Sequence, residues 1–316
     1  YYANCLNGLL FFAEGQPWPE PAQLTRQHLR DFMDYLSNEP RRWAGDGRRA
    51  TCRKASPGTV HHYIKVTKTF LNWCLYEDYL TENPALRLRL PPASYKEIEP
   101  YSDDELKAML AALEHEIKYG QRYLGLRNKA IIAVFIDTGL RLTELTEMKL
   151  SEMDPQLRLV RVLGKGAKMR LVPLNGEARK ILKAYLTQYR PAGGDRVWLT
   201  DDGEVLQPRS VQIMIDRLQR QAGVTSGGGA HRFRHYYATR YLENGGDMNS
   251  LRVLLGHNSL SMVLKYTKFF EARKDIGRAQ EFSPFDSLLQ RGCHSGSRPD
   301  GWGFRQKGVQ PEGWRQ

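Results

Sequence analysis

The proline pair at positions 91 and 92 most constrains what this chain can fold into, because helices and central strands both end at such a pair. It lies in Leu90-Pro91-Pro92-Ala93-Ser94, a segment typical of an interdomain linker. The chain has 316 residues, which is more than one hydrophobic core usually holds. We therefore expect a domain at 1–93 and a second at 94–285. The Gly-, Arg- and Gln-rich segment at 286–316 predicts a flexible tail.

Residues 1–93 show only helical periodicity. Ser56 and Pro57 are the residue types favoured at the N-cap and first turn of a helix, and apolar residues continue at helical spacing to position 74. Another short helix should end at Asn83-Pro84. The chain begins inside an apolar pattern and without Met, so we expect a fragment whose first helix is shortened. The apolar face predicted for that first helix consists of Leu6, Leu9, Leu10 and Phe11.

The second region combines several helices with one β region. Ser102-Asp103-Asp104-Glu105 has the capping-box pattern that opens a helix. Apolar residues fill 129–138 and predict a buried helix that ends at Gly139. Alternating residues between 157 and 174, around the turn Gly164-Lys165-Gly166, predict a β-hairpin. Further helices are expected at 177–188, 210–222, 231–245, 248–255, 260–266 and 269–279. The predicted fold class is therefore mainly α with a small β-sheet.

The chain carries a formal net charge of +12. Such an excess favours a polyanionic partner, most often nucleic acid. An anionic membrane is the competing partner, but no apolar run approaches the roughly 18 residues of a membrane span. The four cysteines are scattered without a C-x-x-C spacing, which indicates reduced thiols in the cytoplasm. We expect no membrane role, no metal site and no small-molecule substrate.

His231-Arg232-Phe233-Arg234-His235 opens a predicted helix that ends at Gly245-Gly246. His231 and Arg234 are three residues apart, so they project from the same side of that helix. Unpaired N–H groups and the helix dipole favour anions at a helix start, and a guanidinium and an imidazole add to this preference. The segment therefore suits a phosphate. The alternative is a surface helix that happens to be basic.

Other basic residues are candidates for contacts with DNA phosphates. The loop at 41–54 is rich in arginine, and it is either a solvated loop or a phosphate-contacting arm. Lys65 and Lys68 lie off the apolar stripe of their helix and are expected to face DNA. Lys168 and Arg170, in the predicted hairpin, should contact backbone phosphate or solvent. The loop residues that we predict to bind DNA are Arg48, Arg49, Arg53 and Lys54.

Four segments, taken together, resemble the tyrosine recombinase (phage integrase) family, the Xer and lambda integrase group. They are residues 138–145, 163–174, 231–235 and 254–267. Each is weak alone, but their order and spacing over residues 100 to 280, with Tyr266 nine residues after His257, form a specific signature. The N-terminal helices resemble the core-binding domain of that family more loosely.

The resemblance assigns a role to each matching residue. The residues that match catalytic positions are Arg141, Lys165, His231, Arg234, His257 and Tyr266, with Glu144 in a supporting position. By this resemblance, Arg141 and Arg234 neutralise a phosphodiester and stabilise its pentacoordinate state. Tyr266 attacks phosphorus, forms a 3′-phosphotyrosine and releases a 5′-hydroxyl.

The same resemblance implies the proton transfers. Lys165 protonates the leaving 5′-oxygen, and His231 accepts the proton of Tyr266. His257 donates to a phosphate oxygen. Glu144 orients the first arginine. Because the phosphotyrosine conserves the bond energy, neither ATP nor another cofactor is expected.

The resemblance also predicts how the chain meets DNA. Arg232 stands where the family more often has a smaller or aliphatic residue, and it is an additional candidate for a phosphate contact. The two domains should form a C-shaped clamp on a double-stranded recombination site. Four copies should assemble there as a tetramer, with the helix at 269–279 docked on a neighbour. A cytoplasmic, nucleoid-associated bacterial protein is expected, which serves a mobile element or a chromosome.

Two other functions stay open. A type IB topoisomerase shares the catalytic logic, although the two-histidine pattern and the small helical N-terminal domain favour a recombinase. An integrase-like DNA-binding protein without catalysis is the other alternative. The presence of all six expected catalytic side chains argues against it.

Overall fold

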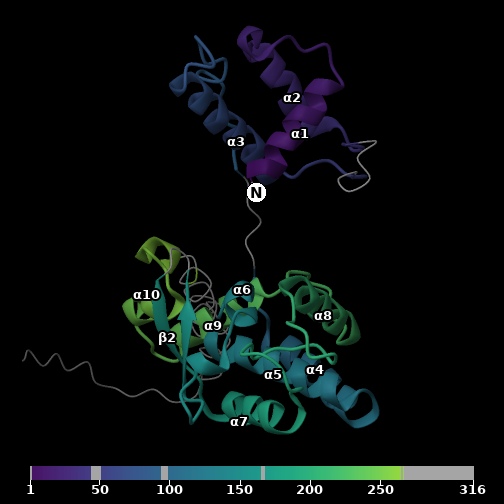
Figure 1. Ribbon diagram of the computed structural model, residues 1–316, viewed down its shortest axis with the longest axis vertical. Helices are drawn as coiled ribbons and strands as arrows, with labels where there is room; N and C mark the ends of the chain where they lie inside the picture. Colours follow the sequence, from purple (N-terminus) through teal and green to yellow (C-terminus); the bar gives the residue numbers. More distant parts are fainter. Residues whose placement is uncertain (1, 44–50, 94–98, 165–167, 265, 267–316) are drawn as a thin grey trace, which may run out of the picture. The chain divides into compact units, whose positions relative to one another are not determined.

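The chain divides into two compact units, residues 1–97 and 98–316 (Figure 1). The computed structural model describes residues 2–43, 51–93, 99–164, 168–264 and 266. We call the two parts the N-terminal unit and the C-terminal unit. Several predictions lie outside the described residues, namely those on Arg48, Arg49, Lys165, the helix at 269–279 and the tail.

The N-terminal unit is helical, as the periodicity predicted. Its helices are α1 (Tyr2–Glu14), α2 (Arg26–Asn38) and α3 (Pro57–Tyr76), with a short 3-10 turn η1 (Pro21–Gln23). α3 begins where predicted, because the Ser56 hydroxyl accepts a hydrogen bond from the backbone N–H of Thr59 at 3.2 Å. Phe32 and Ile64 are fully buried between the helices. The stretch before Asn83 forms turns, so the short helix predicted there is wrong.

The predicted apolar face of α1 needs correction. The buried residues of α1 are Cys5, Gly8 and Phe12, whereas Leu10 is 57% exposed. The reason is close packing at Gly8, where an added Cβ would lie 2.8 Å from the Tyr63 ring. A small residue therefore faces the core. Leu9 and Phe11 pack against the edge of that core as predicted, whereas Leu10 lies to the side of it.

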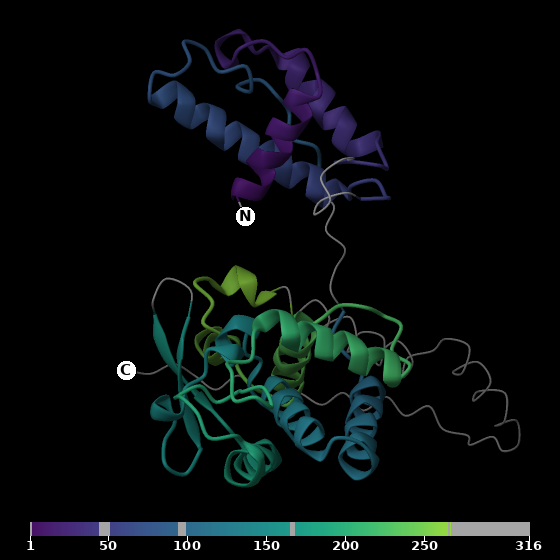
Figure 2. The ribbon, with the colours of Figure 1, turned by 45° about the vertical axis from the view of Figure 1, so that its right-hand side comes forward.

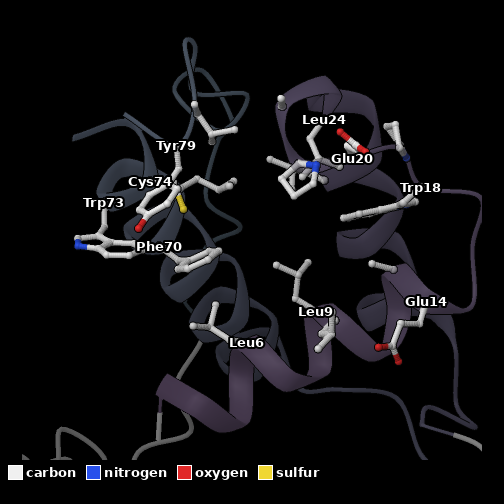
Figure 3. A pocket seen from close by; sticks show the side chains of 18 of the residues that line it. Leu6, Leu9, Glu14, Trp18, Glu20, Leu24, Phe70, Trp73, Cys74 and Tyr79 are labelled. Carbon is white, nitrogen blue, oxygen red and sulfur yellow. The ribbon is translucent and has the colours of Figure 1, made fainter. Parts of the chain in front are cut away.

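Those leucines line an apolar groove between α1 and α3 (Figure 3). The groove has a volume of about 800 Å³ and is lined by Leu6, Leu9, Phe70 and Trp73, among others. Trp73 is 49% exposed although it is a large apolar residue. Hydrophobic packing in the N-terminal unit is thus incomplete on this side.

The C-terminal unit is mainly helical with a two-stranded sheet, which confirms the predicted fold class (Figure 2). Its longer elements are α4 (Asp103–Tyr119), α5 (Arg122–Thr138), β1 (Leu159–Leu163), β2 (Met169–Pro173), α7 (Gly176–Ala184), α8 (Pro208–Gln221), α9 (His231–Glu243) and α10 (Met248–Leu255). Its shorter helical elements are α6 (Leu142–Thr146), η2 (Leu150–Glu152), a π-turn η3 (Tyr185–Tyr189) and η4 (Leu260–Met262).

Helix α5 forms the centre of this unit and contacts α4, α7 and α9. Ile131, Ile132 and Phe135 are completely buried, as the apolar run predicted. The Phe135 ring stacks on Phe233 of α9 with centroids 5.4 Å apart. This contact fixes the beginning of α9 against the core, next to the two positions that we singled out for phosphate binding.

The β-hairpin has the predicted strands and alternation. β1 and β2 are antiparallel, with Val160 opposite Val172 and Leu163 opposite Met169. Val160 and Val172 are buried, so one face of the hairpin packs on the core. In the described parts of the chain, no helix is both long enough and apolar enough to span a membrane.

Candidate active site

Arg234 is the buried centre of the site, with 1% of its surface exposed. Its Nη1 donates to the carbonyl of Gly139 at 2.9 Å, and its Nη2 donates to the carbonyl of Leu255 at 2.6 Å. Nη2 also lies 2.7 Å from Nε2 of His257. These contacts use three of the guanidinium's N–H groups. A guanidinium carries five in total, so two remain for other partners.

The acceptors of Arg234 are carbonyls at the ends of two helices. Gly139 ends α5 in a left-handed conformation, with φ of 59°, and Gly256 ends α10 in the same way, with φ of 65°. The last carbonyls of a helix have no partner within the helix, and the helix dipole is negative there. A buried cation is stabilised at such a place. The local glycines therefore explain why an arginine can be buried here.

Arg141 is the second guanidinium of the site. It is the N-cap of α6, and 27% of its side chain is exposed. Its Nη1 donates to Glu144 Oε1 at 2.8 Å, and its backbone N–H donates to Glu144 Oε2 at 2.9 Å. The Leu255 carbonyl lies 3.5 Å from the same Nη1. One carbonyl thus adjoins both arginines, and Arg141 is the more accessible of the two.

Glu144 is almost fully buried, at 6% exposure. Burial alone would raise the pKa of its carboxyl. Hydrogen bonds from Arg170 and from Arg141 outweigh that effect and lower the pKa to about 2. Glu144 is therefore ionised at neutral pH, and its negative charge lies between two guanidiniums.

His257 is buried at 5% exposure and follows the end of α10. Burial and the guanidiniums of Arg234, Arg141 and Arg170 lower its pKa to about 3, so its ring is neutral at pH 7. Because Nε2 accepts from Arg234, we assign the proton to Nδ1. Nδ1 has no hydrogen-bond partner among the described residues. A buried N–H group without a partner is free to donate to a bound anion.

His231 begins α9 and is exposed at its surface. Partial removal of the ring from water lowers its pKa, and the guanidiniums of Arg234 and Arg141 lower it further. A histidine that resists protonation can accept a proton from a neighbouring hydroxyl. Its ring centroid lies 5.6 Å from that of His235.

Tyr266 is only 4% exposed. Its ring stacks on His257 with centroids 5.9 Å apart, and it meets His235 edge-on at 4.9 Å. Burial lowers the pKa of Arg234 to about 10, and the Tyr266 phenol opposes that decrease. The phenol therefore lies within the field of this guanidinium. His235, which touches Tyr266, was not among the predicted site residues, although its place one turn after His231 was a signal for it.

Two predicted DNA contacts need correction. Arg232 is 4% exposed and is held at the start of the C-terminal unit. It donates to the carbonyls of Glu99 and Pro100, pairs with Glu105 at 2.8 Å and stacks over the Tyr101 ring at 4.0 Å. All five N–H groups of the guanidinium have acceptors within the protein, so none is left for the predicted phosphate contact.

Arg170 is the second correction, because it pairs with Glu144 and donates to the Leu254 carbonyl. Both its guanidinium and that of Arg232 have acceptors within the protein, which a sequence pattern does not reveal. The main contacts of Arg170 are therefore with Glu144 and Leu254, and 10% of its side chain stays exposed.

Most of the other predicted DNA contacts that the structure describes are exposed. Lys168 lies next to β2 and is exposed. In the N-terminal unit, Arg53, Lys54 and Lys65 are exposed. Lys68 is half-buried, and its Nζ donates to the Leu88 carbonyl at 2.8 Å. No cluster of metal-ligating side chains occurs in the described parts of the chain.

The arrangement offers two guanidiniums, two histidines of lowered pKa and a tyrosine around one place. Arg141 and Arg234 are fixed through a shared carbonyl, so their forks require little reorganisation to bind an anion. Neutral His257 adds an N–H donor. Such a site stabilises a dianionic oxygen cluster, and Tyr266 supplies a hydroxyl beside it.

The comparison with known proteins agrees with this chemistry. A model of the phage integrase family matches residues 101–273. The tyrosine recombinase XerC of Lactobacillus delbrueckii subsp. bulgaricus is 31% identical over 263 residues, which cover 81% of this chain and 82% of that protein.

Two solved structures share the fold. XerH site-specific recombinase, bound to a palindromic difH substrate in a post-cleavage complex, aligns with a TM-score of 0.68 and 19% identity. The alignment covers 88% of this chain and 78% of XerH. A lambda integrase (75–356) dimer bound to a COC′ core site aligns with a TM-score of 0.64 and 16% identity, over 84% and 87% of the two chains.

Proposed function

The chain belongs to the phage integrase family and is a site-specific tyrosine recombinase, a DNA strand-transfer enzyme, and we propose that Tyr266 is its nucleophile. The observation that carries this assignment is the position of Tyr266. Its ring contacts His257, and its phenol lies in the field of buried Arg234. The hydroxyl is thus held beside a buried guanidinium of the site.

The proposed reaction begins when a DNA phosphodiester binds between Arg141 and Arg234. The guanidiniums and the Nδ1–H of His257 stabilise the charge on the nonbridging oxygens as the pentacoordinate state forms. The Tyr266 oxygen attacks phosphorus, and His231 accepts its proton. A 3′-phosphotyrosine forms while the bond from phosphorus to the 5′-oxygen breaks.

The 5′-alkoxide needs a proton to leave, and we propose Lys165 as the donor. Lys165 belongs to the hairpin turn between β1 and β2 in the sequence and lies outside the described residues. The reverse reaction uses a 5′-hydroxyl as the nucleophile. Because the phosphotyrosine keeps the bond energy, rejoining requires no ATP and no cofactor.

We propose that the N-terminal unit also binds the duplex, through Arg53, Lys54 and Lys65. Arg48, Arg49 and Lys168 are proposed to add contacts with phosphates. Exposed cations neutralise phosphates and release counterions, so they contribute affinity without sequence specificity. The relatives named above, XerH and lambda integrase, are bound to DNA in their structures.

Assembly follows from the number of cleavages. Exchange between two duplexes breaks four strands, and each cleavage consumes one tyrosine, so we propose that four copies assemble on DNA. Residues after Lys268 are proposed to dock on a neighbouring copy. Deleting them should preserve DNA binding and impair synapsis, measured by the mass of the complex. Recombination at the normal rate by the shortened protein would contradict the docking.

Covalent capture tests the nucleophile. The wild-type chain is incubated with a pool of random-sequence duplexes, and DNA that stays bound after denaturation is isolated. Tyr266→Phe should bind the same DNA and yield no covalent complex. If Tyr266→Phe still captures DNA, another residue is the nucleophile. Strand exchange between two marked duplexes, compared with relaxation of one supercoiled circle, then tests recombination directly.

Sulfur substitution tests the general acid. A thiolate is a much weaker base than an alkoxide and leaves without a proton. Replacing the bridging 5′-oxygen with sulfur should therefore restore cleavage by Lys165→Ala but not by Tyr266→Phe. Arg141→Ala should also remain slow, because the role of this arginine is to stabilise nonbridging oxygens. Rescue of a His257 or Lys168 variant instead would identify a different acid.

A further inference from the structure

Arg170 is placed to act on the site without touching the reacting DNA. It lies in β2, and 10% of its side chain is exposed. Its Nη1 and Nη2 donate to the two oxygens of Glu144 at 3.0 and 2.8 Å. Its Nε donates to the Leu254 carbonyl at 2.8 Å. All three nitrogens of the guanidinium thus have acceptors within the protein.

These contacts connect three elements of the site. Glu144 belongs to α6 and pairs with Arg141, while Leu254 belongs to the end of α10, just before His257. The bidentate pair fixes both oxygens of the carboxylate, which is the geometry that an arginine fork and no lysine provides. Arg170 therefore connects the hairpin with the end of α10 and, through Glu144, with Arg141.

The backbone beside Arg170 is adapted to it. A Cβ added to Gly256 would lie 3.1 Å from Nη1 and 3.3 Å from Cδ of Arg170. The guanidinium therefore packs closely over this glycine, in addition to the hydrogen bond to Leu254. A long polar chain that only reached toward solvent would not need such a fit.

The charges show what Arg170 balances. Glu144 is buried, and without Arg170 the only guanidinium hydrogen-bonded to its carboxylate would be that of Arg141. A buried carboxylate then either draws Arg141 fully to itself or takes up a proton. In either case Arg141 loses the position in which its guanidinium can contact both Glu144 and a bound phosphate.

We propose that Arg170 is a positioning residue of the recombinase, which holds Glu144 as an ionised, fixed acceptor and so keeps Arg141 aligned for the scissile phosphate. This rests on the proposed function, in which Arg141 binds that phosphate. It differs from the phosphate contact predicted from the sequence, because Arg170 acts through Glu144.

A double-mutant cycle tests the proposal. Arg170→Met, Glu144→Gln and the double variant are compared in single-turnover formation of the covalent complex. The DNA is a nicked duplex carrying a site obtained by covalent capture with the wild-type chain. Arg170→Met should slow cleavage about 100-fold, the cost typical of a small misplacement of a catalytic group. In the Glu144→Gln background the same change should cost less than about 5-fold, because contacting residues couple strongly.

The pH dependence separates positioning from a general loss of structure. Glu144 faces Arg141 on α6, Arg170 on β2, Arg234 on α9 and His257 after α10. Without Arg170, burial raises the pKa of Glu144, so its carboxylate becomes protonated as the pH falls. Cleavage by Arg170→Met should therefore decrease more steeply than that of the wild type as the pH is lowered. The double variant should lack this additional decrease.

Arg161→Met is the matched control. Arg161 lies on the paired strand β1, its side chain is 58% exposed, and it forms only a surface ion pair with Glu152. Its loss should leave the cleavage rate unchanged. Arg170→Lys keeps the charge without the fork. It should cleave more slowly than the wild type while its DNA affinity, measured with Tyr266→Phe added, stays the same.

Three results would overturn the proposal: an equal cost of Arg170→Met in both backgrounds, a wild-type rate for Arg170→Lys, or a loss of DNA affinity as large as the loss of rate. The last would make Arg170 a phosphate contact. If Arg170→Met does not fold, the Arg170→Lys result decides. A wild-type chain that captures no DNA covalently would refute the proposed function, which each of the three results above leaves intact.

Discussion

Helices α3 and α9 each carry two basic residues near one another, yet the structure uses them in opposite ways. On α3, Lys65 is exposed and Lys68 is half-buried. On α9, Arg232 and Arg234 are almost completely buried and hydrogen-bonded to backbone carbonyls. The same charge in the same type of element is thus either exposed at the surface or hydrogen-bonded inside the fold.

The difference teaches what a buried guanidinium is for. A flexible ammonium contributes charge over a range of positions, whereas a planar fork held by carbonyls is fixed before the substrate arrives. Burial itself does not identify the role. Arg232 holds Tyr101 and the start of α4, whereas Arg234 contacts His257 and interacts with Tyr266. Four predictions test this contrast, beginning with the largest expected effect.

Arg234→Ala should produce the largest loss. It removes the donor that is fixed by Gly139 and Leu255, and formation of the covalent complex should slow by about 10³-fold, as when a preorganised donor of charge stabilisation is lost. Arg234→Lys should recover little, because an ammonium cannot replace the fork. Single-turnover cleavage measures both. A lysine variant with nearly normal rates would show that only charge matters here.

Arg232→Leu should affect the fold and not the chemistry. Its buried guanidinium pairs with Glu105, whose side chain is 22% exposed. The loss of unfolding free energy should therefore be smaller than the roughly 3–5 kcal/mol that removal of one partner from a fully buried pair costs. Chemical denaturation of the variant measures this loss.

The salt dependence of DNA affinity provides the corresponding control for Arg232. Its log–log slope should stay at the wild-type value, because Arg232 contacts no phosphate in the proposed function. A shallower slope with unchanged stability would restore the DNA contact that the sequence predicted.

His257 should make stability depend on pH. Its pKa falls from 6.5 to about 3 on folding, so the unfolded chain binds a proton that the folded chain refuses. The contribution of His257 to the free energy of unfolding is therefore fully present above about pH 6.5, and it decreases as the pH falls toward 3. At pH 5 the loss should be about 2 kcal/mol.

Chemical denaturation of the wild type and of His257→Gln, each at pH 7.5 and at pH 5, measures this contribution. The wild type should lose about 2 kcal/mol more unfolding free energy than His257→Gln between these two pH values. Gln keeps an acceptor for Arg234 and does not titrate, so it should lose less stability on acidification. Equal losses in the two proteins would show that His257 is not the group responsible.

Much of the fold was predictable because its signals are local. The Ser102 capping box, the Gly139 helix end and the alternation of β1 and β2 each depend on neighbouring residues, and the structure has them where predicted. The inward face of α1 was only partly predicted, because the burial of Gly8 depends on Tyr63, which is far away in the sequence. Gly8 carries no hydrophobic signal of its own.

The site was predictable to the extent that its residues form a pattern of types and spacings. Arg141, His231, Arg234, His257 and Tyr266 could be named from the pattern. Their buried supports could not, because the acceptors are carbonyls, which every residue possesses. Arg170 and Arg232 were assigned to DNA for the same reason: a sequence shows a cation and does not show the Glu144 or Glu105 that meets it.

The smallest effects are expected for the two lysines of α3, which differ from the buried arginines of α9 in being accessible to solvent. Lys65→Met should lower the slope of log affinity against log salt by about 0.9, the contribution of one neutralised phosphate, and should leave stability unchanged.

Lys68→Met is the matched variant on the same helix. The Lys68 ammonium is already hydrogen-bonded to the Leu88 carbonyl, so it is less free to move to a phosphate, and its slope should change less while stability decreases slightly. Binding to a mixed-sequence duplex at several salt concentrations, in the Tyr266→Phe background, gives both slopes. Equal decreases would mean that the tether to Leu88 opens on DNA, and no decrease for Lys65 would mean that exposure on this helix does not indicate contact with the duplex.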